Sequence, residues 1–166
     1  MADFSPLNGR ALITGGSSGL GLTFARHLAR RGLDLVLAAR NPERLDETAR
    51  ELRELGVDVE VLPADLSTDD GVQAVAERVG STDSPINVLV NNAGAGLYTR
   101  MATADATALL AGTQLMALAP MVIGGAAAAA MKERGEGVII NTSSMAGAAP
   151  MGAYSAIKSF IRVWSD

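Results

Sequence analysis

Short apolar runs alternate with longer segments in which apolar residues recur at helical spacing, and this alternation extends along the whole chain. The apolar runs predict five strands, at residues 11–13, 35–39, 57–62, 86–90 and 137–142. The helical spacing predicts helices at residues 19–31, 42–55, 68–79 and 116–134, and a last one that starts near residue 154.

Residues that favour helix ends mark several of these boundaries. Pro42 suits the first turn of the second helix, where no backbone N–H is needed, and Gly56 is expected to end that helix. Ser67 or Thr68 is expected to cap the third helix, which reaches Val79.

Strands that alternate with helices indicate an α/β fold, in which right-handed crossovers build a parallel sheet with helices on both faces. The predicted strands are apolar on both faces, as doubly covered strands are. The 166 residues form one domain, residues 1–166, with no internal repeat. Ligands of such sheets bind at the carboxyl ends of the strands.

Composition narrows the chemistry. The chain has no cysteine, which excludes disulfides, zinc thiolate sites and thiol catalysis. Its one histidine, His27, lies in a helical pattern and is interpreted as an ordinary helix residue. The formal net charge of −4, without a long basic run, argues against nucleic acid or an anionic membrane as partner.

Two segments bear on location. Residues 1–10 have no apolar leader and no cationic start, so we expect a cytoplasmic protein. Residues 115–131 are uncharged and apolar, but they contain Pro120, Gly124 and Gly125 and many alanines. A buried helix is favoured there over a membrane span.

The first strand leads into the first helix through Thr14-Gly15-Gly16-Ser17-Ser18-Gly19-Leu20-Gly21. Glycines let the backbone approach a ligand closely, and the helix N-terminus offers free N–H groups to a phosphate. The spacing is G-x-x-x-G-x-G rather than G-x-G-x-x-G, and a flexible connection is the alternative. The predicted phosphate-binding residues are Gly15, Ser17, Ser18, Gly19, Leu20 and Gly21.

Three further strand ends carry candidate cofactor-binding residues. No acid follows the second strand; Arg40 stands there instead, which favours the 2′-phosphate of NADP over the free ribose of NAD, unless Arg40 is simply solvated. Asp65 and Leu66 follow the third strand, where Asp65 can accept from an adenine amino group. Asn92, Ala93 and Gly94 follow the fourth strand and place small residues beside a cofactor ring.

Ser144, Tyr154 and Lys158 form a candidate catalytic set. Tyr154 and Lys158 are four residues apart and share one face of a helix. An ammonium group beside a phenol stabilises the phenolate, which equips a tyrosine for acid–base work. A serine hydroxyl upstream can hold a substrate oxygen, whereas an ordinary helix with a solvated lysine is the alternative.

With these motifs in this order, the chain resembles the short-chain dehydrogenase/reductase family from about Gly9 to Asp166. The resemblance implies a Rossmann-type doubly wound sheet of strand order 3-2-1-4-5 that binds NADP, or less favourably NAD. It also implies hydride transfer between the nicotinamide and a small-molecule carbonyl or secondary alcohol. By the same resemblance, Tyr154 exchanges the proton, Lys158 also binds the nicotinamide ribose, and Ser144 positions the substrate oxygen.

Three features depart from the family pattern. Counting from Gly94 and from Ser144 places Met116 where the family has an asparagine that helps to hold a proton-relay water. Ser144 precedes Tyr154 by ten residues, where the family has about thirteen, so Ser143 is an alternative. The chain also ends within the last helix, and we expect it to lack the family's C-terminal strands and substrate lobe.

Several readings of function stay open. The leading one is an NADP-dependent oxidoreductase. A non-catalytic NADP-binding relic, a fragment of a longer reductase and a short chain completed by a partner or a homo-oligomer are alternatives. A generic α/β domain without a nucleotide site is the least favoured, and no metal site is expected.

Overall fold

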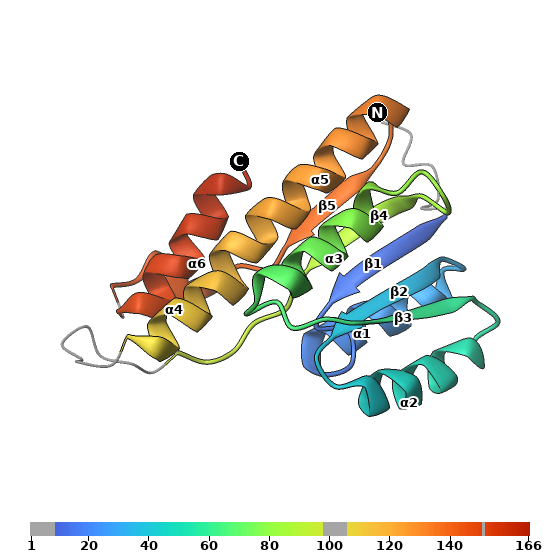
Figure 1. Cartoon of the computed structure of the whole chain (residues 1–166), viewed down its shortest axis with the longest axis horizontal. Coiled ribbons are helices and arrows are strands. Elements are labelled where there is room, and N and C mark those ends of the chain that lie inside the picture. The colour runs from blue at the N-terminus through green and yellow to red at the C-terminus, as the bar shows by residue number, and fades with distance from the viewer. Residues whose placement is uncertain (1–8, 98–105, 151) are drawn as a thin grey trace.

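A parallel sheet of five strands forms the centre of the molecule, in the order β3-β2-β1-β4-β5 (Figure 1). The computed structural model describes residues 9–97, 106–150 and 152–166. The expected fold class and strand order are confirmed. The strands are β1 (Arg10–Thr14), β2 (Asp34–Ala39), β3 (Val59–Pro63), β4 (Ile86–Asn91) and β5 (Val138–Asn141).

Helices cover both faces of this sheet (Figure 1). Because successive strand residues point to opposite faces, Ile13 packs with α1 and α2 while its neighbour Leu12 packs with α3 and α5. A smaller cluster joins α6 to the middle of the long helix. The helices are α1 (Gly19–Arg30), α2 (Pro42–Arg53), α3 (Asp69–Gly80), α4 (Thr107–Thr113), α5 (Ala119–Arg134) and α6 (Ala153–Trp164).

Local signals set several helix ends as expected. Asn41 accepts a hydrogen bond from the backbone N–H of Arg44 at 2.7 Å, and Pro42 follows it in the first turn of α2. Gly56 adopts a positive φ of 84° after that helix. Thr68, rather than Ser67, caps α3 by accepting from the backbone N–H of Gly71 at 3.2 Å.

The fourth predicted helix begins earlier than expected. Instead of starting at Met116, it starts at Thr107, and a π-helical turn, η1 (Gln114–Leu118), joins α4 to α5. None of the α4 residues is buried, so this segment has no apolar stripe from which its helix could be read. The third strand also begins two residues later than predicted, at Val59.

The apolar helix Thr107–Arg134 is long enough to cross a membrane by length and composition. In this structure 44% of its most apolar 18-residue stretch is buried. One face of the helix packs in the core. Ala119, Ile123, Ala127 and Met131 follow one another at intervals of four residues on that face. One face of α5 therefore belongs to the core of this domain.

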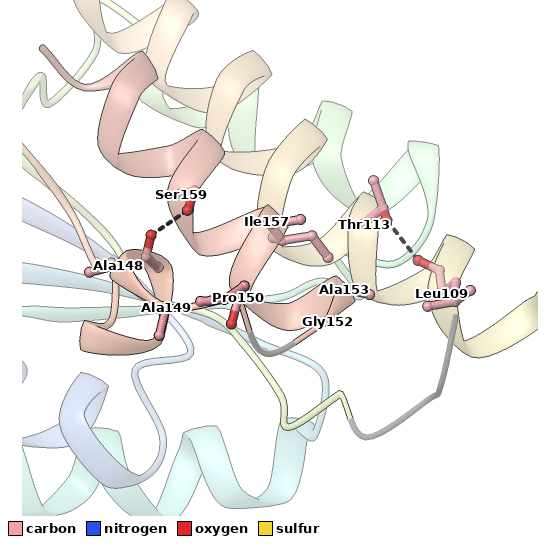
Figure 2. A pocket seen from close by; sticks show the side chains of 12 residues that line it. Leu109, Thr113, Ala148, Ala149, Pro150, Gly152, Ala153, Ile157 and Ser159 are labelled. Atoms are coloured by element: carbon pink, nitrogen blue, oxygen red, sulfur yellow. Dashed lines mark hydrogen bonds between the residues drawn. The ribbon is translucent and has the colours of Figure 1, made fainter. Parts of the chain in front are cut away.

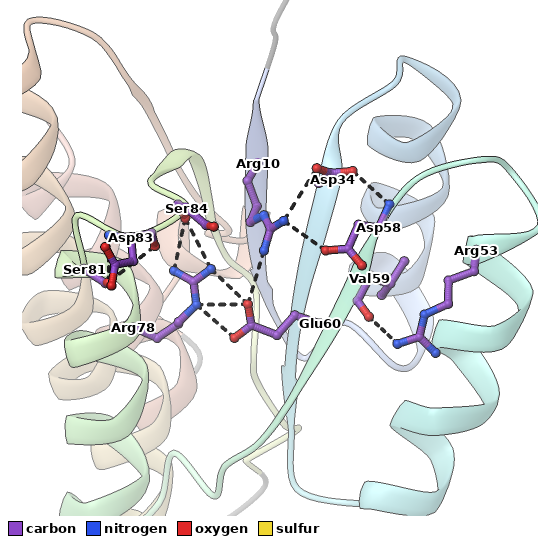
Figure 3. A network of polar contacts seen from close by, with 10 residues as sticks. All are labelled: Arg10, Asp34, Arg53, Asp58, Val59, Glu60, Arg78, Ser81, Asp83 and Ser84. Carbon is purple, nitrogen blue, oxygen red and sulfur yellow. Dashed lines mark hydrogen bonds and ion pairs between the residues drawn. The ribbon is translucent and has the colours of Figure 1, made fainter.

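Charged side chains tie three strands together at the amino ends of the sheet (Figure 3). The guanidinium of Arg10 lies 2.9 Å from the carboxylate of Asp58, 3.4 Å from that of Glu60 and 3.6 Å from that of Asp34. Glu60 also pairs with Arg78 of α3 at 2.9 Å. Both arginine side chains are about 15% exposed, so this network lies partly out of solvent.

We expect Glu60→Gln to lower the free energy of unfolding by about 1–3 kcal/mol, because two poorly exposed guanidinium groups lose their shared carboxylate. Urea unfolding of the variant measures this loss. Glu51→Gln is the matched control, since the Arg26–Glu51 pair is exposed on both sides. A Glu60→Gln variant as stable as the Glu51→Gln variant would contradict the prediction.

Candidate active site

The turn between β1 and α1 has the backbone shape of an anion cradle. Gly15 and Gly19 adopt positive φ values of 68° and 52°, and a Cβ on Gly19 would meet no atom within 4 Å. Ser18 occupies the N-cap of α1 but forms no side-chain cap hydrogen bond within the described part of the chain. The first N–H groups of α1 are therefore available to a phosphate.

Gly21 has a different task from the other two glycines. A Cβ on Gly21 would lie 2.1 Å from the carbonyl oxygen of Gly15 and 2.6 Å from the side-chain nitrogen of Asn92. The residue is buried and lines neither cavity described below. Gly21 therefore lets α1 pack closely on the turn, while Gly19 faces open space.

Thr14 joins this turn to the end of β4. Its hydroxyl oxygen accepts from the backbone N–H groups of Asn92 at 2.9 Å and of Ala93 at 3.0 Å. The side-chain amide of Asn92 donates to the carbonyl oxygen of Thr14 at 3.1 Å. Asn92 therefore has a structural role besides its place beside the cofactor groove.

A cavity of about 240 Å³ lies over the carboxyl ends of β1, β2 and β3. Arg40 lines it together with Asn41 and Arg44, two residues that the sequence did not single out. Among the predicted cofactor-binding residues it also contacts Gly15, Ser17, Ser18, Leu66, Ala93 and Gly94.

Asp65 lies beside this cavity rather than in its lining. One carboxylate oxygen accepts from the backbone N–H of Ser67 at 2.9 Å and from its hydroxyl at 2.7 Å. These bonds from Ser67, with a smaller contribution from the charge of Arg40, lower the pKa of Asp65 despite the opposing effect of burial. Asp65 is thus a charged residue that orders the turn after β3.

A second cavity, of about 460 Å³, brings together the three predicted catalytic residues, Ser144, Tyr154 and Lys158. It shares Gly15, Ser18 and Ala93 to Ala95 with the first cavity, so the two are adjoining parts of one groove. The other predicted residues in its lining are Gly19, Leu20 and Asn92.

Lys158 is buried to 6% exposure on α6. Its ammonium donates to the carbonyl oxygen of Thr142 at 2.8 Å and lies 5.9 Å from the ring centre of Tyr154. Burial lowers the pKa of this ammonium below its usual value. The arrangement holds a cation beside the phenol and attaches α6 to the segment that follows β5.

The two candidate serines have different partners. Ser143 donates its hydroxyl hydrogen to the carbonyl oxygen of Lys158 at 2.9 Å. Ser144 accepts from the backbone N–H of Ala146 at 3.1 Å, so its own hydroxyl hydrogen stays available for a substrate oxygen. This geometry favours Ser144 over Ser143 for the predicted role.

The connection after Ser144 begins with a 3₁₀ turn, η2 (Met145–Ala148), which packs on α6. A Cβ on Gly147 would lie 2.9 Å from the backbone of Lys158. The hydroxyl of Ser159 donates to the carbonyl oxygen of Gly147. The short loop therefore still presents Ser144 to the same cavity as Tyr154.

Met116 lines the same cavity as Tyr154 and Lys158, from the π-helical turn η1. The side chain is 2% exposed, and its sulfur lies 3.5 Å from where a Cβ of Gly94 would be. The long helix therefore presents a thioether, which is a weak hydrogen-bond acceptor, at this position. π-Helical turns such as η1 often occur at functional sites.

A buried lysine with a lowered pKa predicts a specific dependence of stability on pH. Between its folded pKa and its usual 10.5, the unfolded chain holds the Lys158 proton more firmly, so stability rises with pH through this window. Urea unfolding from about pH 7 to about pH 10 should show the parent chain gaining stability relative to Lys158→Met.

Lys132→Met provides the control for this comparison, because Lys132 is exposed on α5. Over the same pH range, we expect the parent chain to gain no stability relative to Lys132→Met. A parent chain that gains no stability, or loses stability, relative to Lys158→Met as the pH rises would contradict the assignment.

Comparison with known proteins agrees with this geometry. The family model described as short chain dehydrogenase matches residues 10–166. A very-long-chain 3-oxoacyl-CoA reductase of Podospora anserina is 32% identical over 165 residues, which cover 94% of this chain and 48% of the relative. The chain spans about half the length of the curated relatives it matches.

Two solved structures are similar over nearly the whole chain. A bulky-bulky ketone specific alcohol dehydrogenase from Comamonas testosteroni has a TM-score of 0.91 and 38% identity, covering 97% of this chain and 65% of that one. A short-chain dehydrogenase from Sphingobium yanoikuyae in complex with NADPH has a TM-score of 0.90 and 40% identity, covering 95% and 63%. This chain belongs to the short-chain dehydrogenase family.

Proposed function

We propose that this chain is the cofactor-binding and catalytic part of an NADP-dependent oxidoreductase that acts on a small-molecule ketone or secondary alcohol. The observation that carries the proposal is the groove itself. It joins a glycine turn with open space over Gly19 to the cavity that Ser144, Tyr154 and Lys158 line. The ketone-specific and NADPH-bound structures of similar proteins support the same substrate class and cofactor.

The residues of the groove fit a dinucleotide. The pyrophosphate would lie at the free N–H groups of α1, over the open space at Gly19. Arg40 would face the adenosine ribose, and the carboxylate of Asp65 stands beside that half of the groove. When bound, the nicotinamide supplies or accepts the hydride.

The chain's own residues handle the proton and the substrate oxygen. In the reducing direction the Tyr154 hydroxyl donates its proton to the substrate carbonyl oxygen, while the Ser144 hydroxyl donates a hydrogen bond to the same oxygen. The ammonium of Lys158, held by the Thr142 carbonyl, stabilises the phenolate that results. In the oxidising direction the same groups work in reverse.

Titration with NADPH, followed by nicotinamide fluorescence and with NADH as comparator, tests the cofactor half of the proposal. We expect saturable binding that prefers NADPH. Turnover is then measured on a panel of ketones, where Tyr154→Phe should lower kcat by about 10²–10⁴-fold and leave NADPH binding in place. Arg162→Ala, an exposed residue of the same helix, serves as control and should leave kcat unchanged.

The outcomes separate the alternatives. Binding of NADPH without turnover, unaltered by Tyr154→Phe, would favour a non-catalytic NADP-binding module, which Met116 in the catalytic cavity also favours. A folded chain that binds neither cofactor would overturn the proposal.

Met116 itself can be tested separately. In Met116→Asn the side-chain amide can hold a water in the catalytic cavity, through which Tyr154 regains its proton, so we expect kcat to rise by about tenfold with NADPH affinity unchanged. Met116→Leu keeps an apolar side chain of similar size and should not raise kcat. Equal kcat values for the two variants, both with the parent's melting temperature, would show that proton supply through this position does not limit turnover.

A further inference from the structure

Two arginines, Arg40 and Arg44, line the cavity over the ends of β1, β2 and β3, which is the half of the groove proposed to hold the adenosine. They lie one residue before and three residues after Asn41, the N-cap of α2. No acidic side chain lines this half among the described residues. Two like charges around one small cavity repel each other unless an anion lies between them. The cavity therefore favours an occupant with more than one negative charge at this end.

The two arginines are free to bind such an anion. Most other guanidinium groups of the described chain are engaged: that of Arg26 pairs with Glu51, and that of Arg134 donates to the carbonyl oxygen of Ile86. Arg40 and Arg44 have no hydrogen-bond or ion-pair partner for their side chains within the described residues. Both side chains are exposed at the mouth of the cavity.

Their surroundings distinguish the two. The charge of Arg40 is the smallest of the effects that lower the pKa of Asp65, so Arg40 has an acid in its neighbourhood. No acidic partner is recorded for Arg44 in the described part of the chain. Its backbone N–H is held by the side chain of Asn41 at 2.7 Å, which fixes the first turn of α2 beside the end of β2. Arg44 is therefore a cation without an acidic partner among the described residues, in a helix turn that a cap hydrogen bond fixes.

We propose that Arg44 is a second specificity-determining residue, which together with Arg40 binds the 2′-phosphate of the adenosine ribose from two sides. The inference rests on the proposed function and adds to it a residue and a charge requirement. A guanidinium binds phosphate through two parallel N–H···O bonds, and two guanidinium groups match the two charges of a monoester phosphate. A free ribose hydroxyl gives neither group such a partner.

The test uses the adenosine half of the cofactor alone. Adenosine 2′,5′-bisphosphate and adenosine 5′-monophosphate are titrated calorimetrically into the parent chain and into Arg44→Ala, Arg44→Lys and Arg40→Ala. We expect Arg44→Ala to weaken the bisphosphate by about tenfold and to leave the monophosphate within about twofold. Arg44→Lys should recover part of the loss, because it keeps the charge and loses the bidentate geometry.

Arg30→Ala, an exposed arginine at the end of α1 that does not line the groove, is the matched control and should change neither affinity. Equal losses for both nucleotides in Arg44→Ala would overturn the inference, because they would show a structural role for Arg44. So would unchanged affinity for both. A parent chain that binds neither nucleotide, yet is folded, would instead refute the proposed function as well.

Discussion

The hydrogen bonds of Thr14 join the turn after β1 to the segment after β4, and both of them line the groove. Thr14 ends β1, and its hydroxyl and carbonyl oxygens bind the segment that follows β4. The glycine turn after β1 and the small residues Ala93 and Gly94 therefore lie side by side, although they are far apart in the sequence. The parallel sheet makes this possible, because it brings the carboxyl ends of neighbouring strands to one edge.

The catalytic half depends on a different kind of attachment. Between α6 and the segment after β5, side chains bind backbone: Lys158 binds the Thr142 carbonyl, and Ser143 binds the Lys158 carbonyl. At the far end of α6, the side chain of Asn141 donates to the Ser165 hydroxyl at 3.0 Å. Polar bonds along most of the helix thus fix its position and its rotation, which together aim Tyr154 and Lys158 into the cavity.

On another face, between η2 and α4, α6 borders a cavity of about 880 Å³. Figure 2 shows the side chains that line this cavity. Its lining consists mostly of small residues, such as Ala149, Gly152 and Ala153. The catalytic helix is therefore packed tightly against η2 on one side and loosely toward α4 on the other. The η2 contacts and the bonds to the β5 segment carry the positioning of the active residues.

The sequence predicted those parts of the molecule that leave a periodic or spaced signal. Strands buried on both faces appear as apolar runs, and the glycine turn and the Tyr154–Lys158 spacing show directly in the residue order. The start of α4 left no such signal, because none of its side chains is buried. The choice between Ser143 and Ser144 also needed the structure, since it depends on which backbone group each hydroxyl meets.

Arg44 was missed for a related reason. It lies in the first turn of a charged helix, where an arginine is unremarkable, and only the fold shows that this turn borders the groove. Arg40 was found because it directly follows a strand, and the end of a strand is a known position for ligand contacts. A residue that borders the groove because its helix packs there cannot be found by inspecting the residues that follow the strands.

The two ends of the groove differ in the charged side chains that line them, and so in whether those side chains act on cofactor binding or on turnover in the proposed function. Among the described residues, the end proposed to hold the adenosine presents two exposed cations and no acid in its lining, an arrangement that suits an anionic ligand. The catalytic end holds a single buried cation, Lys158, whose charged form burial disfavours, beside the thioether of Met116. Under the proposed function, cofactor preference and the rate of proton supply to Tyr154 would therefore be set mainly by different residues, at opposite ends of this groove.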